Sequence, residues 1–193
     1  MTPSRNIVTD DDRLLDATRD CVLAVGWRRT TMTDVARRAG VSRMTVYRRW
    51  PDMAALTSDV VKRELRLSLP VALSSAESPD STSITAWIVS LVSEVEKNPL
   101  FVKMIDVDPE VLLTYLLQRQ SESQESVVAV LTDVIRKAQR HGDVRRGRPE
   151  VLAQTVVLMC QGFLLSRRTM NETRYTERIA HREMRRALVS YLT

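Results

Sequence analysis

The amino-acid sequence predicts an all-α fold of about nine to ten helices. Long stretches of the 193 residues repeat apolar side chains at helical spacing, whereas the alternating runs typical of β-strands are nearly absent. Only 5 glycines and 7 prolines punctuate these stretches, and 44% of the residues are hydrophobic, which is enough to bury a core. The length allows one large domain or two small ones.

The first two predicted helices follow a short N-terminal arm, residues 1–9. Helix 10–25 opens on acidic residues, which suit the positive end of the helix dipole, and Gly26 ends it. Thr31 is placed to cap the next helix, with Asp34 three residues later as its partner in a capping box.

The segment 31–50 is predicted to form two short helices joined by a tight turn. Ala36 is small enough for the helices to cross closely, and Gly40 supplies the left-handed residue that ends the first one. Ser42 is positioned to cap the second helix. This is the pattern of a helix-turn-helix, whose second, recognition helix enters the major groove of DNA. The side chains assigned to its core are Val35, Ala36, Val41, Val46 and Trp50.

Start and stop signals define the remaining helices. The stretch 70–83, rich in serine and proline, is the clearest break in composition, and Asp108-Pro109-Glu110 has the cap, proline and acid of a helix start. We expect an N-terminal helix-turn-helix domain, 1–51, and a C-terminal helical domain, 52–193. The predicted helices are 53–69, 81–97, 98–106, 109–141 with an interruption near 120–124, 149–170, and a last one from the cap Asn171 to Leu192.

Charge is concentrated on the helix-turn-helix. The chain has a net charge of +5, while the segment 26–50 alone carries seven arginines against Asp34, a charge of +6. A localised basic stripe is the electrostatic signature of a surface that binds phosphates, although a solvated charged face is the alternative.

Particular residues can be assigned to DNA contacts. Arg43 and Met44 begin the recognition helix, where Arg reads guanine through two bonds and an apolar side chain meets the thymine methyl. Arg48 and Arg49 are expected on phosphates. The alternatives are a solvated charge for each arginine and a packing role for Tyr47. The predicted contacts are Thr33, Ser42, Arg43, Met44, Thr45, Tyr47, Arg48 and Arg49.

The last two predicted helices indicate a homodimer. In the run 151–165 apolar residues lie all round the helix, so one face can pack on its own domain and the other needs a partner. A second copy of the chain, joined through about 149–192, would also let two recognition helices read a palindromic or pseudo-palindromic operator. The alternative is that both helices are central in a monomeric bundle.

Other classes of protein find little support. The 15-residue apolar run contains Gln154 and Gln161 and is too short and polar for a membrane span, and residues 1–12 form no signal peptide. We therefore expect a soluble, cytoplasmic protein with no membrane partner. No metal-ligand spacing, nucleophile motif or glycine-rich phosphate loop occurs, which predicts no cofactor, no metal and no enzyme. Cys21 and Cys160 are expected to be buried as small hydrophobic residues.

The segment 14–56 resembles the TetR family of transcriptional regulators. The resemblance implies a variable helical core with a ligand cavity and two C-terminal helices that form a four-helix dimer interface. One position departs from it, because Met53 stands where the family usually has a lysine that meets a phosphate. The residues that carry the resemblance are Gly26-Trp27, Thr30-Thr31, Val35-Ala36, Ala39-Gly40-Val41-Ser42, Thr45-Val46-Tyr47, Trp50-Pro51 and Leu56.

The functional hypothesis is a repressor released from its operator by a small, largely apolar ligand, because few charges interrupt 87–95 and 151–165. The alternative is a DNA-binding dimer without an effector. The candidate ligand residues are Trp87, Phe101, Met104, Tyr115, Met159 and Phe163, for each of which ordinary core packing is the competing interpretation.

Overall fold

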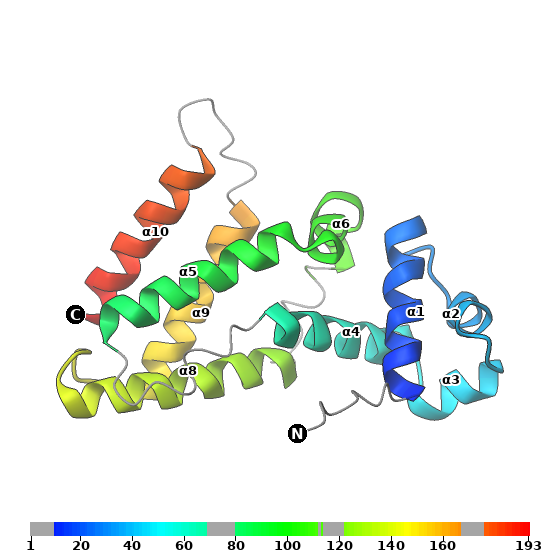
Figure 1. Ribbon diagram of the computed structural model, residues 1–193, viewed down its shortest axis with the longest axis horizontal. Coiled ribbons are helices and arrows are strands. Elements are labelled where there is room, and N and C mark those ends of the chain that lie inside the picture. The colour runs from blue at the N-terminus through cyan, green and yellow to red at the C-terminus, as the bar shows by residue number, and fades with distance from the viewer. Residues whose placement is uncertain (1–9, 69–79, 112, 114–121, 167–175) are drawn as a thin grey trace, which may run out of the picture. The chain divides into compact units, whose positions relative to one another are not determined.

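The computed structural model describes residues 10–68, 80–111, 113, 122–166 and 176–193, and all regular structure within them is helical (Figure 1). The predicted all-α fold is confirmed. The helices are α1 Asp10–Val25, α2 Met32–Ala39, α3 Arg43–Arg49, α4 Met53–Ser68, α5 Ser81–Lys97, α6 Pro99–Val107, α8 Glu122–His141, α9 Pro149–Ser166 and α10 Glu177–Leu192.

The predicted boundaries hold closely through α6, and two later ones need correction. Helix α8 is already regular from Glu122, inside the interruption expected at 120–124. Helix α10 begins at Glu177 with Thr176 in the N-cap position, not at the expected cap Asn171, which lies outside the described residues. Asn171 and Thr176 are both cap-type residues that precede the buried face of α10. The first buried residue of that face, Ala180, lies one turn after Thr176.

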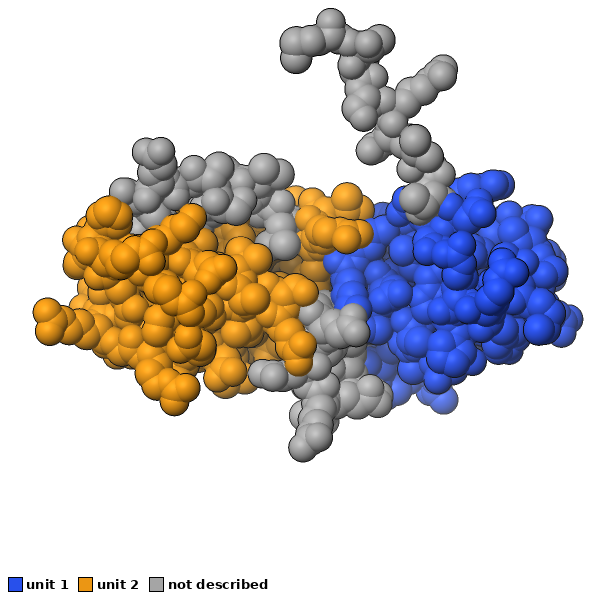
Figure 2. All heavy atoms as spheres, turned by 90° about the horizontal axis from the view of Figure 1, so that it is seen from below, with its two compact units in different colours: residues 1–64, 99–119 blue, residues 65–98, 120–193 orange. Residues whose placement is uncertain are grey.

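The chain divides into two compact units (Figure 2). Unit 1 combines residues 1–64 with 99–119, and unit 2 combines 65–98 with 120–193. The first unit thus includes the helix-turn-helix and also α6, which lies much later in the sequence. The proposed domain division after residue 51 stays a prediction.

In unit 1, α1 packs against both α2 and α6, and α2 packs against α3. The amphipathic faces of these helices supply the core, as the 3.6-residue period requires. Its most deeply buried apolar side chains are Leu14, Val22, Val35, Ala36, Val46, Leu56, Val60, Val61, Leu100 and Met104.

A buried carboxylate joins the end of α1 to the residues after α6. The backbone N–H of Trp27 donates to Asp108 Oδ2 at 2.7 Å, and Asp108 is only 3% exposed. Gly26 makes this approach possible, because its φ is 90° and a Cβ there would lie 2.8 Å from the same oxygen. The sequence predicts Asp108 as a helix cap. Its carbonyl accepts the Val111 N–H at 2.9 Å, while its carboxylate holds a segment 81 residues away.

Unit 2 packs α5, α8, α9 and α10 around a second core. The C-terminal end of α10 is held by Arg145, which donates through its backbone N–H to Leu192 O and through Nε to Tyr191 O, both at 2.7 Å. The Arg145 guanidinium also lies 4.7 Å from the centre of the Tyr191 ring. The fully buried or nearly buried core residues include Ile84, Trp87, Ile88, Val92, Leu131, Ile135, Ala138, Leu152, Val156, Met184, Leu188 and Leu192.

Helix α9 is incompletely covered by the part of the chain that the structure describes. It runs for 18 residues, longer than the 15-residue apolar run recognised in the sequence, and by length and composition alone it could cross a membrane. Only 17% of its residues are buried, whereas a helix that is apolar all round requires cover on every side. Val151 and Leu158 are 46% and 66% exposed on the uncovered face.

We predict that Asp108→Ala lowers the free energy of unfolding by about 1–3 kcal/mol, because the buried Trp27 N–H loses its acceptor. Urea denaturation followed by circular dichroism measures the change. The control is Glu110→Ala, which removes an exposed ion pair with Arg28 and should cost less than about 1 kcal/mol. Equal losses in the two variants would contradict the role given to Asp108.

Candidate DNA-binding interface

A complete capping box begins α2. The Asp34 N–H donates to Thr31 Oγ1, and the Thr31 N–H donates to Asp34 Oδ2, both at 3.2 Å. The Thr31 hydroxyl also donates to Asp34 Oδ2 at 2.5 Å, and this bond is the main reason that the pKa of Asp34 lies below its usual value. The predicted capping box is confirmed.

The turn between α2 and α3 has the predicted geometry. Gly40 adopts φ 70°, and the Val41 N–H donates to Ala36 O at 3.0 Å, the six-residue closure of a Schellman motif. Ser42 then caps α3, since its Oγ accepts the Thr45 N–H at 3.1 Å. The recognition helix therefore begins at a defined residue and in a defined direction.

Core packing behind α3 is as expected with one exception. Val35, Ala36, Val46 and Trp50 are all 5% exposed or less, but Val41 is only half-buried because it lies in the turn itself. The Trp50 indole Nε1–H donates to Asp59 Oδ2 on α4 at 2.8 Å, so the end of the recognition helix is tied to the next helix.

The residues predicted to contact DNA form the outer side of the motif. Met44 is 74% exposed and Tyr47 is 47% exposed, which are high values for large apolar side chains. Ser42, Arg43, Arg48 and Arg49 are exposed, while Thr33 and Thr45 are half-buried. The Thr45 hydroxyl lies 2.9 Å from that of Ser42. Their roles in binding stay a prediction.

Several arginines of the basic stripe are paired with acids that lie outside the segment 26–50. Arg38 contacts Asp20 on α1 at 3.0 Å, and Arg49 pairs with Asp11, also on α1. By contrast, Arg43 and Arg48 make no ion pair within the described part of the chain. The first helix thus partly neutralises the stripe. Local sequence patterns do not indicate these ion pairs, because the paired residues lie 18 and 38 positions apart.

The start of α4 also meets the expectation drawn from its sequence. Asp52 Oδ1 accepts the Ala55 N–H at 2.8 Å, and the half-buried Met53 is the first residue of the helix. No cation stands at the position where the resemblance implies a lysine.

The candidate ligand residues are divided between the two units. Trp87 is a member of the unit 2 core, and Met159 and Phe163 pack against that core. Phe101 and Met104 are buried in unit 1, and Tyr115 lies outside the described residues. The ligand assignment for all six stays a prediction.

A capped recognition helix with an exposed, basic and partly apolar outer side defines a helix-turn-helix DNA-binding protein. Residues 14–60 match the family model described as bacterial regulatory proteins, tetR family. An uncharacterised HTH-type transcriptional regulator of Mycobacterium tuberculosis is 33% identical over 158 residues, which span 80% of this chain and 79% of that protein. The chain therefore belongs to the tetR family and is a DNA-binding transcriptional regulator.

Solved structures give the same fold. The transcriptional repressor QsdR of R. erythropolis, from the TetR family, aligns with a TM-score of 0.71 at 19% identity, covering 95% of this chain and 94% of that one. FadR from Bacillus subtilis, in complex with stearoyl-CoA, aligns with a TM-score of 0.64 at 12% identity and covers 94% and 98%. The prediction that the chain is not an enzyme is confirmed, since its relatives are transcriptional regulators.

Proposed function

We propose that this protein is a cytoplasmic repressor that binds a palindromic or pseudo-palindromic operator as a homodimer and leaves it when a small, largely apolar ligand binds. The observation that carries the proposal is the capped recognition helix with Arg43 and Met44 exposed at its start. Release would follow if the ligand binds more tightly to a form of the dimer whose recognition helices are wrongly spaced.

The DNA contacts follow from position on the motif. Arg43 and Met44 lie where a recognition helix meets base edges, and the absence of an ion pair at Arg43 within the described chain supports a base-reading role. Arg48 and Arg49 take phosphates, and one of them replaces the cation that Met53 does not supply. The proposed set is Thr33, Ser42, Arg43, Met44, Thr45, Tyr47, Arg48 and Arg49.

A homodimer through about 149–192 is supported by the uncovered face of α9. Val151, Gln154, Leu158 and Gly162 are exposed at helical spacing along it. Gly162 has open space where a Cβ would lie, so a second helix could approach closely. The apolar residues of α10, in contrast, are largely used within unit 2. A dimer would bury the apolar surface that a monomer leaves in water.

The apolar character of the proposed ligand is supported by Trp87, Met159 and Phe163, which belong to or pack against one apolar core. FadR, which shares the fold, was solved with the acyl thioester stearoyl-CoA. The runner-up function, a dimeric regulator without an effector, uses the same DNA-binding surface.

Thermal shift with long-chain fatty acids, their CoA thioesters and flat aromatic compounds separates the two functions. We expect at least one compound to raise the melting temperature and, in a fluorescence-anisotropy assay, to weaken operator binding. If no compound stabilises the protein, the effector-free regulator is favoured. A compound that stabilises the protein without changing operator affinity would contradict ligand-driven release.

We predict that Arg43→Ala relaxes base preference at one position of each half-site, at a cost of about 1–3 kcal/mol of discrimination. Arg49→Ala should instead weaken binding to all sequences and make log Kd less dependent on log salt, with a slope lower by less than about one, because Arg49 is already paired with Asp11. Selection of bound fragments from random DNA supplies the operator, and titrations at several salt concentrations supply the slopes. Identical losses on operator and random DNA for Arg43→Ala would remove its base-reading role.

We predict that Leu158→Arg converts the dimer to a monomer, because it places a charge in the centre of the uncovered α9 face. Light scattering should then give the 22.0 kDa of one chain in place of twice that mass. Leu67→Arg is the matched control, since Leu67 is 73% exposed on α4, outside the proposed interface. A wild-type monomer, or a Leu158→Arg dimer, would rule out this interface.

A further inference from the structure

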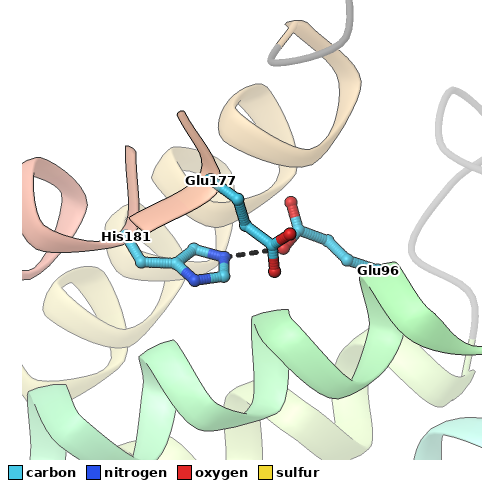
Figure 3. Close-up of side chains that lie close together, drawn as sticks. All are labelled: Glu96, Glu177 and His181. Atoms are coloured by element: carbon cyan, nitrogen blue, oxygen red, sulfur yellow. Dashed lines mark hydrogen bonds and ion pairs between the residues drawn. The ribbon is translucent and has the colours of Figure 1, made fainter. Parts of the chain in front are cut away.

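Three potential metal ligands converge in unit 2, away from the helix-turn-helix sequence. Glu96 belongs to α5, and Glu177 and His181 belong to α10 (Figure 3). His181 Nε2 lies 2.6 Å from Glu96 Oε2, and one ligand atom from each of the three residues lies within 4.8 Å of the others. The two glutamates are separated from each other by 81 positions in the sequence, so no local sequence motif indicates the cluster.

The packing of α5, α9 and α10 encloses His181 and Glu96. Glu177 and His181 are four residues apart on α10, which places both on one face of the helix. The flanking residues Ala180 and Met184 are buried, and α10 packs against α5, which carries Glu96. The Phe163 ring, centred 5.9 Å from the His181 ring, covers the imidazole from α9. The side chains of His181 and Glu96 are therefore only 16% and 8% exposed.

We propose that Glu96, Glu177 and His181 form a binding site for a divalent transition-metal cation of the zinc class, which joins α10 to α5.

The distances suit an ion of this size. Zinc binds imidazole nitrogen and carboxylate oxygen at about 2.0–2.2 Å, so neighbouring ligand atoms in a tetrahedral site lie roughly 3.4 Å apart. The His181–Glu96 pair is closer than this, and the ligand atoms of all three residues lie within 4.8 Å of one another. To hold the ion, His181 Nε2 and Glu96 Oε2 need to separate by less than about 1 Å, and the exposed Glu177 side chain needs to rotate toward them.

Ligand chemistry selects the class of metal. An imidazole with two carboxylates suits Zn²⁺ and its first-row neighbours, whereas Mg²⁺ and Ca²⁺ prefer oxygen ligands alone. The group is also negative overall, since two carboxylates outweigh one imidazole even when it is protonated. Three protein ligands leave a fourth position for water or a small anion.

A simple ion pair between His181 and Glu96 is the competing explanation, but it gives no role to Glu177. Lys97, next to Glu96, pairs with Glu94 at 3.7 Å, and Arg182, next to His181, pairs with Glu183 at 3.0 Å, while Arg178, next to Glu177, is exposed. A divalent ion accounts for all three side chains at once.

Equilibrium dialysis and calorimetry with Zn²⁺, and visible absorption with Co²⁺, test the proposal on the tag-free full chain. We expect one ion per chain, Co²⁺ absorption bands typical of low coordination number, and a melting temperature raised by metal. Glu177→Gln and His181→Ala should each weaken binding at least about tenfold. Glu177→Gln changes an exposed side chain, so it tests the site even if His181→Ala impairs folding.

The matched control is His141→Ala, because the chain has only one other histidine and it is exposed at the end of α8. Its affinity for Zn²⁺ should equal that of the unaltered protein. The thiols are poor competitors, since burial raises the pKa of Cys160 to about 12 and also raises that of Cys21. Failure of the unaltered chain to bind Zn²⁺ or Co²⁺, or binding that survives both site variants, would overturn the proposal. These measurements use no DNA, so they stand or fall independently of operator binding.

Discussion

The hydrogen bond from the Trp27 N–H to the buried Asp108 carboxylate joins the two separate stretches of sequence that make up unit 1. It attaches the residues after α6 to the end of α1, and α1 in turn packs on α2. Gly26 makes this contact possible in two ways: its backbone adopts a positive φ, and its missing Cβ leaves space for the carboxylate. The DNA-binding helices are therefore completed by a segment that follows α5, so a change in the position of α6 would be felt directly by α1.

Sequence patterns were sufficient for the helix-turn-helix because every determinant there is local. Thr31 with Asp34, Gly40, and Ser42 each act on backbone groups within five residues, so their spacing alone specifies the geometry. The same holds for the helix periods, which arise from the 3.6-residue repeat of apolar side chains. The outer residues of α3 follow from these, since fixing Val46 and Trp50 inside leaves Met44 and Tyr47 outside.

Long-range polar pairs could not be found in this way. Asp108 carries a helix-start signal, and nothing in its neighbourhood indicates that its side chain holds Trp27. Glu96 and His181 were equally hidden, since 85 residues separate them and each lies in an ordinary polar stretch of a helix. The sequence predicts Asn171 as the cap of the last helix, whereas α10 begins at Glu177, because Asn171 and Thr176 are both cap-type residues that local sequence does not distinguish. The candidate ligand residues share a chemical type, aromatic or sulfur-containing, and chemical type does not specify the unit to which each belongs.

The acids of α1 give the basic surface a particular thermodynamic character. Asp20 and Asp11 already neutralise Arg38 and Arg49 before any DNA arrives. A phosphate that meets one of these arginines displaces a carboxylate of the same chain, so it releases fewer counterions than a contact with an unpaired cation does. Random DNA, whose binding relies on charge alone, would lose the larger share of its affinity through this competition. The first helix would then act as a built-in competitor that discourages prolonged residence on the wrong sequence.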